Sequence, residues 1–207
     1  MKTIKVVIFF ILFFSINLFA NSQYNFKYDL ISNNKKIGTL ESNCIKNKNN
    51  IYKYTTKLNM KYQFVFMNYE YKYVEEAYIK DGKLQSLIVY EKDDDTIKNI
   101  KAKRDGDFLV YTNGIKVDMR KIDYLPFDYK SKSYENKVTS KNFTLTTFDP
   151  LTGNIYLEKN FILDSSNSDL IKIKTIGYNN SVEERTILKD GTLINFKNEF
   201  FEAKLVK

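Results

Sequence analysis

The chain has 207 residues, of which 43% are hydrophobic, which suffices for a folded core and excludes a disordered or collagen-like protein. It contains no histidine and a single cysteine, which excludes an intrachain disulfide, a CxxC redox pair and a thiolate zinc site. Lysine and arginine outnumber aspartate and glutamate by 33 to 25, but these charges are dispersed, so we expect no nucleic-acid interface.

The first twenty residues have the pattern of an export signal. Lys2 and Lys5 precede an apolar run over residues 6–14, and Leu18-Phe19-Ala20 has the form of a cleavage site. The run is shorter than the ~20 apolar residues needed to span a bilayer. We therefore expect residues 1–20 to be a signal peptide cleaved after Ala20, and the mature protein to be periplasmic. Cys44 lies too far inside the mature chain for a lipid anchor, and we expect a buried thiol, with an intermolecular disulfide as the alternative.

From residue 24 onward, apolar and polar residues alternate with a period of two, which is typical of half-buried strands. Pairs such as Asn33-Asn34, Asp81-Gly82 and Asp190-Gly191 predict tight turns between them. Gly38 indicates a bulge or a close backbone approach. The predicted strands are 24–30, 37–45, 52–61, 62–79 (bent near Asn68 or divided in two), 84–90, 97–103, 108–112, 115–119, 143–148, 155–163, 170–178, 182–188 and 193–206 (bent around Asn198).

The alternation lapses only over residues 120–142, which we interpret as a long surface connection or a short helix. No repeat, linker or change of composition divides the rest, so residues 21–207 are expected to form a single domain. Its fold class is predicted as all-β, a strongly curved antiparallel meander of about eleven strands with little helix. Because strands twist, so long a sheet must curl into a half-barrel or open barrel, with apolar side chains inside and lysines outside.

Four short segments resemble one exported bacterial family. They are residues 28–38 (YDLISNNKKIG), 75–84 (EEAYIKDGKL), 102–110 (AKRDGDFLV) and 149–153 (DPLTG). Together they are similar to domain-of-unknown-function family 6134 and its relatives in family 3108. The resemblance implies a curved antiparallel sheet similar to that of the periplasmic lipoprotein-localisation carriers, and it implies no particular activity.

Motifs that would indicate catalysis or metal binding are weak. Glu75 and Glu76 are adjacent in a predicted strand, so they point to opposite faces and cannot flank one bond; we expect one to be solvated and the other to lie near a sheet edge. The acidic run over residues 93–95 lacks the spacing of a calcium loop and is read as a turn. Ser165-Ser166 and Thr146-Thr147 have no base at motif spacing. We therefore predict no catalytic residue, no metal site and no cofactor.

Aromatic residues on one face of the predicted sheet are the candidate binding residues. They either pack as a core or line an open cavity, and the sequence offers little helix to cover them. A bound acyl chain burying about ten methylenes would gain roughly 8 kcal/mol before ordering costs, and tyrosine hydroxyls at the mouth would suit a head group. The candidate ligand-binding residues are Tyr52, Tyr54, Phe64, Phe66, Tyr69, Tyr71 and Tyr73.

The sequence is compatible with three functions. The first is a non-enzymatic, carrier-like protein that binds a lipid, an acyl chain or another apolar partner in the concave sheet. The second is a structural or assembly factor of the envelope that pairs an open sheet edge with another protein. The third is an enzyme that uses carboxylates and tyrosines alone, which would require buried carboxylates inside the cavity. The sequence identifies no ligand, no protein partner and no oligomeric state.

Overall fold

The computed structural model describes residues 24–47, 51–64, 67–122, 141–164, 169–177 and 180–206. The predicted signal peptide and most of the predicted 120–142 connection lie outside these ranges. Within them, no helix is both long and apolar enough to cross a membrane. The elements are β1 (Tyr24–Ser32), β2 (Lys35–Lys46), β3 (Ile51–Phe64), β4 (Met67–Lys80), β5 (Lys83–Asp93), β6 (Thr96–Asp105), β7 (Phe108–Tyr111), β8 (Lys116–Asp118), the 3₁₀ turn η1 (Met119–Lys121), β9 (Asn142–Phe148), β10 (Ile155–Asp164), β11 (Leu170–Ile176), β12 (Val182–Leu188), β13 (Leu193–Lys197) and β14 (Glu202–Leu205).

The local sequence explains both the strands and the turns between them. Along β3, Tyr54 and Thr56 are buried while Lys57 and Asn59 are exposed, as the period of two requires. The pair Asn33 and Asn34 turns the chain with φ of 49° and 60°, a backbone that asparagine tolerates and that matches the twist of a two-residue hairpin. The tight turns read from the sequence therefore set the hairpin ends.

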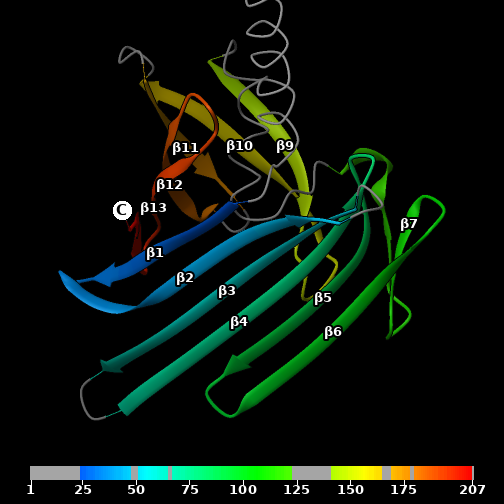
Figure 1. The fold of residues 1–207 in the computed structure, drawn as a ribbon, viewed down its shortest axis with the longest axis horizontal. Coiled ribbons are helices and arrows are strands. Elements are labelled where there is room, and N and C mark those ends of the chain that lie inside the picture. Colours follow the sequence, from blue (N-terminus) through cyan, green and yellow to red (C-terminus); the bar gives the residue numbers. More distant parts are fainter. Residues whose placement is uncertain are drawn as a thin grey trace, which may run out of the picture.

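All fourteen strands form one antiparallel sheet whose ladder runs β8-β7-β6-β5-β4-β3-β2-β1-β14-β13-β12-β11-β10-β9. Figure 1 shows β1 to β6 as a broad curved sheet, from which β9 to β13 turn upward. The first and last strands pair in its middle, where Tyr28 faces Leu205. β8 and β9 are the two ends of the ladder, and no pairing joins them in the described ranges. The predicted all-β, curved antiparallel meander is thus confirmed, and the barrel it forms is not closed.

The concave side of this sheet is packed in two apolar clusters. The first cluster gathers side chains of β2 to β8, η1 and the end of β9, and the second gathers side chains of β1, β2, β9 and β11 to β14. Members of the first are Cys44, Tyr54, Ala77, Ile79, Leu84, Leu87, Val89, Ala102, Leu109, Tyr111, Val117, Met119 and Phe148. Members of the second are Tyr28, Leu30, Leu40, Leu145, Ile171, Ile173, Ile187, Leu193, Phe196 and Ala203. Cys44 is 1% exposed, which confirms that it is buried.

The turn between β9 and β10 packs against the β7–β8 hairpin. A Cβ at Gly153 would lie 3.1 Å from methyl carbons of both Ile115 and Val117. Phe148, at the end of β9, is buried in the first cluster. Side-chain packing therefore brings the two open edges of the sheet together at this point without a shared ladder.

Gly38 combines the two features that its position suggested. The pairing of β1 with β2 shifts between Leu30 and Ile31, opposite Gly38, which is a β-bulge. A Cβ at Gly38 would lie only 2.0 Å from the backbone oxygen of Asn59 in β3. A side chain at this position would displace β3, so both the predicted bulge and the predicted close approach are confirmed.

The structure has fourteen strands rather than about eleven, and two of the predicted ranges each cover parts of two strands. Of the two alternatives for the predicted strand 62–79, a bend near Asn68 or a division in two, the structure has the division: β3 ends at Phe64 and β4 begins at Met67, so Tyr62 belongs to β3. Its sequence there is a run of large apolar residues without glycine or proline, which hides the break. The predicted strand 193–206 is β13 and β14, joined by a turn in which the backbone nitrogen of Asn198 donates to the oxygen of Phe201 at 3.0 Å.

Candidate functional site

A groove of about 920 Å³ opens at one end of the sheet, the end that carries the β1–β2 turn, the tips of β3 and β4, and the β13–β14 turn. We call it the groove and its end of the sheet the groove end. Its apolar and aromatic lining comes from β2, β3, β4 and the β13–β14 turn. These side chains are Ile37, Leu58, Met60, Tyr62, Tyr69, Tyr71, Phe200 and Phe201, and the polar ones are Ser32, Asn33, Lys35, Lys36, Lys61 and Gln63.

The alternation of β3 and β4 places the aromatic wall of the groove. Met60 faces Tyr71, and Tyr62 faces Tyr69, in the antiparallel register of the two strands. The rings of Tyr62 and Tyr69 are tilted by 42° with their centroids 4.7 Å apart, which is a favourable aromatic contact. Phe200 is 70% exposed on the β13–β14 turn. These rings offer apolar surface that the two packed clusters leave partly open to solvent.

Three tyrosines on the concave face of β4 donate hydrogen bonds to carboxylates. The hydroxyl of Tyr69 donates to Asp93, that of Tyr71 to Glu91 at 2.9 Å, and that of Tyr73 to Glu75 at 2.5 Å. Burial, reinforced by the hydrogen bond to Glu91, raises the pKa of Tyr71 above its ordinary value. The hydrogen bond to Asp93 raises the pKa of Tyr69 in the same direction. These hydroxyl protons are therefore used in hydrogen bonds within the protein, and the faces of the rings remain available to contact an apolar ligand.

A smaller cavity of about 250 Å³ lies deeper in the barrel, and we call it the inner pocket. It shares Leu58 and Phe201 with the groove, so the two cavities meet at these residues. Its lining mixes apolar side chains with buried carboxylates, which the described lining of the groove does not contain. The lining residues are Leu40, Thr56, Leu58, Tyr73, Glu75, Thr147, Phe148, Pro150, Tyr156, Glu158, Glu183, Arg185 and Phe201.

Charged side chains are buried around the inner pocket. Glu158 is 4% exposed and Arg185 is 3% exposed. The guanidinium of Arg185 contacts Glu183 at 3.1 Å and lies over the ring of Phe196, 4.8 Å from its centroid. Burial raises the pKa of the Tyr156 hydroxyl. Among the described lining residues, three glutamates thus stand against one arginine, so this pocket favours positive charge and hydrogen-bond donors over an anion.

Glu75 was expected to be either solvated or near a sheet edge, and that prediction is wrong. It is buried at 8% exposure because β4 is central to the sheet and Glu75 points to the concave face. Glu76 points to the convex face, where it accepts a hydrogen bond from Lys53 at 2.7 Å. The prediction that the two glutamates face opposite sides is confirmed. In the described ranges, no group of three or more acidic, histidine or cysteine side chains is arranged to hold a metal ion.

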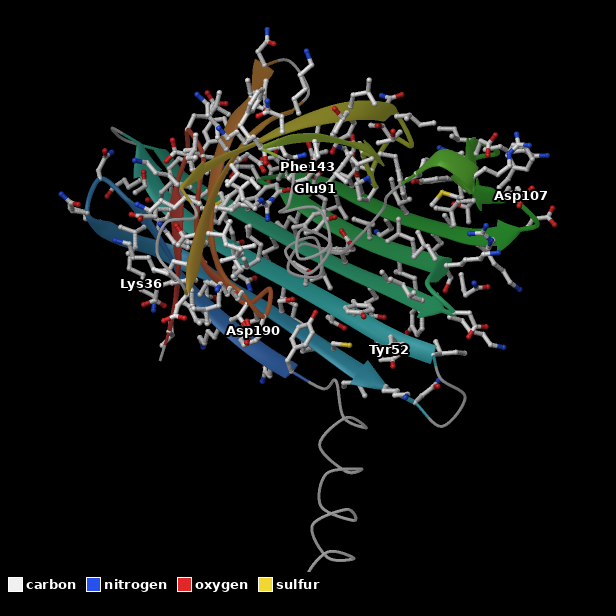
Figure 2. All side chains as sticks on the ribbon, turned by 90° about the horizontal axis from the view of Figure 1, so that it is seen from above. Lys36, Tyr52, Glu91, Asp107, Phe143 and Asp190 are labelled. Atoms are coloured by element: carbon white, nitrogen blue, oxygen red, sulfur yellow. The ribbon has the colours of Figure 1, made fainter. Side chains whose placement is uncertain are left out.

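The seven aromatic residues singled out from the sequence do not lie together. Tyr69 and Tyr71 line the groove, and Tyr73 lines the inner pocket. Tyr54 is buried in the first cluster, and Tyr52 packs against it with ring centroids 6.4 Å apart. Figure 2 shows Tyr52 and Lys36 toward opposite ends of the sheet. Phe64 ends β3, but its side chain, like the whole of Phe66, lies outside the described part of the chain.

Sequence reasoning missed several residues of the groove. Leu58 and Met60 stand on the correct face of the predicted strand, but an aliphatic side chain on that face does not distinguish a binding surface from a core. Phe200 and Phe201 carried no such signal. They reach the groove only because β14 pairs with β1, and that contact joins distant parts of the sequence.

Comparisons with known proteins support the fold. The structure is similar to a beta-barrel-like protein of domain of unknown function DUF1849 from Brucella abortus, with a TM-score of 0.65 and 11% identity over 89% of this chain and 96% of that one. A DUF1089 family protein from Pseudomonas aeruginosa gives a TM-score of 0.44 and 10% identity over 69% of this chain and 83% of that one, too low a score to support an argument. No curated protein matches the sequence. A family model matches residues 28–160, and the chain therefore belongs to the family of the domain of unknown function DUF6134.

Proposed function

We propose that this protein is a non-enzymatic, carrier-like protein that binds a lipid, an acyl chain or a similar apolar molecule in the groove. The observation that supports this most is a groove of about 920 Å³ walled by aromatic, methionine and leucine side chains in a sheet that helices do not cover in the described ranges. Ligand sites are commonly concave and mainly apolar, with a few polar groups. Each buried methylene of a guest contributes about 0.8 kcal/mol, so an acyl chain would bind without any charged contact.

Native mass spectrometry tests this proposal directly. The full-length chain is expressed with its leader, the mature protein is purified gently from the envelope, and bound molecules are extracted with organic solvent. We expect a stoichiometric apolar ligand, and a mature protein whose mass begins at Asn21 if export proceeds as proposed. A protein that carries no ligand, and that takes up none from added lipid, would contradict the binding function.

A pair of neighbouring substitutions locates the ligand. Met60→Trp fills the groove, whereas Asn59→Trp places the same ring on the exposed, convex side of the same strand. We expect Met60→Trp to lower ligand occupancy at least tenfold and Asn59→Trp to leave it unchanged. Equal occupancy in both variants would place the ligand somewhere other than the groove.

Pairing of a sheet edge with another protein is the second candidate function, because the ladder ends at β8 and β9 without joining them. β9 is the longer of the two, with seven residues from Asn142 to Phe148. An open edge offers backbone hydrogen bonds to an added strand. Under this alternative, the protein would leave the envelope in a defined complex with an empty groove, and Thr144→Pro in β9 would dissociate the complex.

The carboxylate-based enzyme is favoured by one observation, namely that Glu75 and Glu158 are buried around the inner pocket. The non-enzymatic proposal assigns these groups to contacts within the protein, as the hydrogen bond from the Tyr73 hydroxyl to Glu75 illustrates. The variant Glu75→Gln tests this choice. We expect it to keep the ligand that copurifies with the wild type unaltered, whereas accumulation of an uncleaved precursor in its place would support catalysis.

A further inference from the structure

The mouth of the groove is rimmed by lysines. Lys35 and Lys36 follow the β1–β2 turn, and Lys61 lies near the tip of β3. All three have well-exposed side chains, and the described lining of the groove contains no carboxylate. The charged side chains of the described lining are therefore all positive.

Two of these lysines pair with a carboxylate, and one of the two carboxylates is shared with other lysines. Lys36 pairs with Asp29 at 2.5 Å, and Lys61 pairs with Glu70 at 3.0 Å. Glu70 also contacts Lys72 at 3.4 Å and Lys92 at 3.2 Å. The hydrogen bonds from Lys61 and Lys92 lower the pKa of Glu70 to about 2. Glu70 thus serves three lysines, so its ion pair with Lys61 leaves the group that these four residues form with a net positive charge.

An acidic hollow lies beside the groove, and it would attract guests of the opposite charge from those attracted by the lysine rim. Asp94 and Asp95, on the β5–β6 turn, line it together with Lys61, Lys92 and Glu70. Tyr62 and Tyr69 line both hollows, so their rings stand at the boundary between them. A cationic guest would favour the acidic hollow, and an anionic guest would favour the lysine rim.

The inner end of the groove has the opposite character from its mouth. Beyond Leu58 and Phe201, the inner pocket presents Glu75, Glu158 and Glu183 against Arg185. An anion there would be repelled by the glutamates in a poorly solvated site, and an apolar tail there would further desolvate buried charged side chains. A guest with one tail and a negative head would therefore lie with its head at the lysines and its tail ending near Leu58.

We propose that the groove selects a single-chain fatty carboxylate, with its carboxylate held at the rim by Lys35, Lys36 and Lys61 and its acyl chain along Met60, Tyr71 and Phe201. This inference rests on the proposed binding function and adds the chemical class of the ligand. The lysine contacts are exposed, so each adds modestly, and together they amount to about a tenfold preference for the anion. The preference weakens as ionic strength rises.

Isothermal titration calorimetry with three twelve-carbon amphiphiles below their micellar concentrations tests the assignment. The ligands are dodecanoate, dodecanol and dodecylammonium, added to the delipidated mature protein at low and at high salt. We expect dodecanoate to bind about ten times more tightly than dodecanol, and dodecylammonium to bind more weakly than either. Equal binding of dodecanoate and dodecanol would overturn the lysine-rim inference while the groove function stands, as would preferential binding of dodecylammonium. Failure of all three to bind would overturn both.

Matched charge variants locate the head group. Lys35→Gln/Lys36→Gln/Lys61→Gln neutralises the rim, and Lys57→Gln/Lys101→Gln/Lys103→Gln removes the same charge from exposed positions outside the groove. We expect only the first triple variant to lose the tenfold preference, with dodecanol affinity unchanged. The single exposed substitution Lys35→Glu, which leaves both ion pairs intact, should lower dodecanoate affinity about threefold. An equal loss in the control triple variant would show that overall charge, and not the rim, sets the preference.

Discussion

The tyrosines at the two ends of β3 and β4 differ in their packing. At one end, Tyr52 and Tyr54 of β3 pack with Ile79 of β4 in the first cluster. At the groove end, Tyr62 of β3 and Tyr69 and Tyr71 of β4 line an open groove. Residue type and alternation are the same at both ends. What differs is the element that faces them across the barrel, and this decides whether a tyrosine is part of the core or of a binding surface.

At the packed end, the facing element is supplied by distant strands. Phe148 of β9 and Tyr111 of β7 belong to the same cluster as Tyr54, and the β9–β10 turn covers the β7–β8 hairpin. At the groove end, the facing side chains are mainly Phe200 and Phe201 on the β13–β14 turn. The comparison teaches that tertiary closure, and not the strand pattern, separates core from cavity.

Truncation of a tyrosine at each end should show the largest difference. Tyr54→Ala removes a ring that is 5% exposed, and large aromatic truncations in cores cost about 3–5 kcal/mol of unfolding free energy. Tyr71→Ala removes a half-buried ring beside an existing groove, so we expect about half that loss. Urea unfolding measures both. Equal losses would mean that the groove end is packed as tightly as the other end.

Alkaline titration should separate the tyrosines into two groups. The hydroxyls of Tyr69, Tyr71, Tyr111 and Tyr156 all have a pKa raised above the ordinary value of 10.0, by burial or by a neighbouring carboxylate. Because the folded state holds these protons more tightly, the associated stability is present below about pH 10 and is lost as pH rises above that value. Phenolate absorbance should show late-ionising tyrosines that ionise together with unfolding. Ionisation of all tyrosines in one early step, with the fold intact, would contradict this.

Removal of a single hydroxyl tests the tyrosine–carboxylate contacts at the groove end. Tyr71→Phe deletes the hydrogen bond to Glu91 and should cost about 1 kcal/mol of unfolding free energy. Tyr78→Phe is the matched control, because its hydroxyl reaches Glu76 at 3.3 Å on the convex face. We expect the control to change stability by no more than a few tenths of a kcal/mol. A larger loss of unfolding free energy in the control would show that the tyrosine–carboxylate contact on the convex face stabilises the protein more than the one on the concave face.

The smallest effect is expected at Glu70. Its lowered pKa means that its ion pairs stabilise the fold above the ordinary value of 4.5 and are lost as pH falls toward about 2. Glu70→Gln should therefore narrow the difference in urea midpoint between pH 5 and pH 2. Because the group lies at the surface, the change is expected to be small. An identical pH dependence of stability in the variant and the wild type would show that the ion pairs of Glu70 do not stabilise the fold.

The sequence was informative about local structure and much less about the site. Alternation assigned the faces of β1 to β3, Asn33-Asn34 located the turn between β1 and β2, and Asp81-Gly82 located the turn between β4 and β5. The division of the predicted strand 62–79 was one of two alternatives, and its position after Phe64 could not be located because no turn residue marks it. The split of the aromatic residues between core and groove depends on which strands face each other, and that follows from the pairing of β1 with β14. Pairing between distant segments has no local signature.

The pairing of β1 with β14 has a consequence for how the chain reaches its fold. Lys27 accepts a backbone hydrogen bond from Val206 at 2.8 Å, so the first and last described strands meet side by side. Loop closure over such a separation is slow, and the two halves of the sheet cannot join before the last strand is available. Consider a circular permutant that links these ends and opens the chain between β8 and β9. In it, every two neighbouring strands of the ladder would also be consecutive in the sequence. This permutant should refold faster than the protein with the natural strand order.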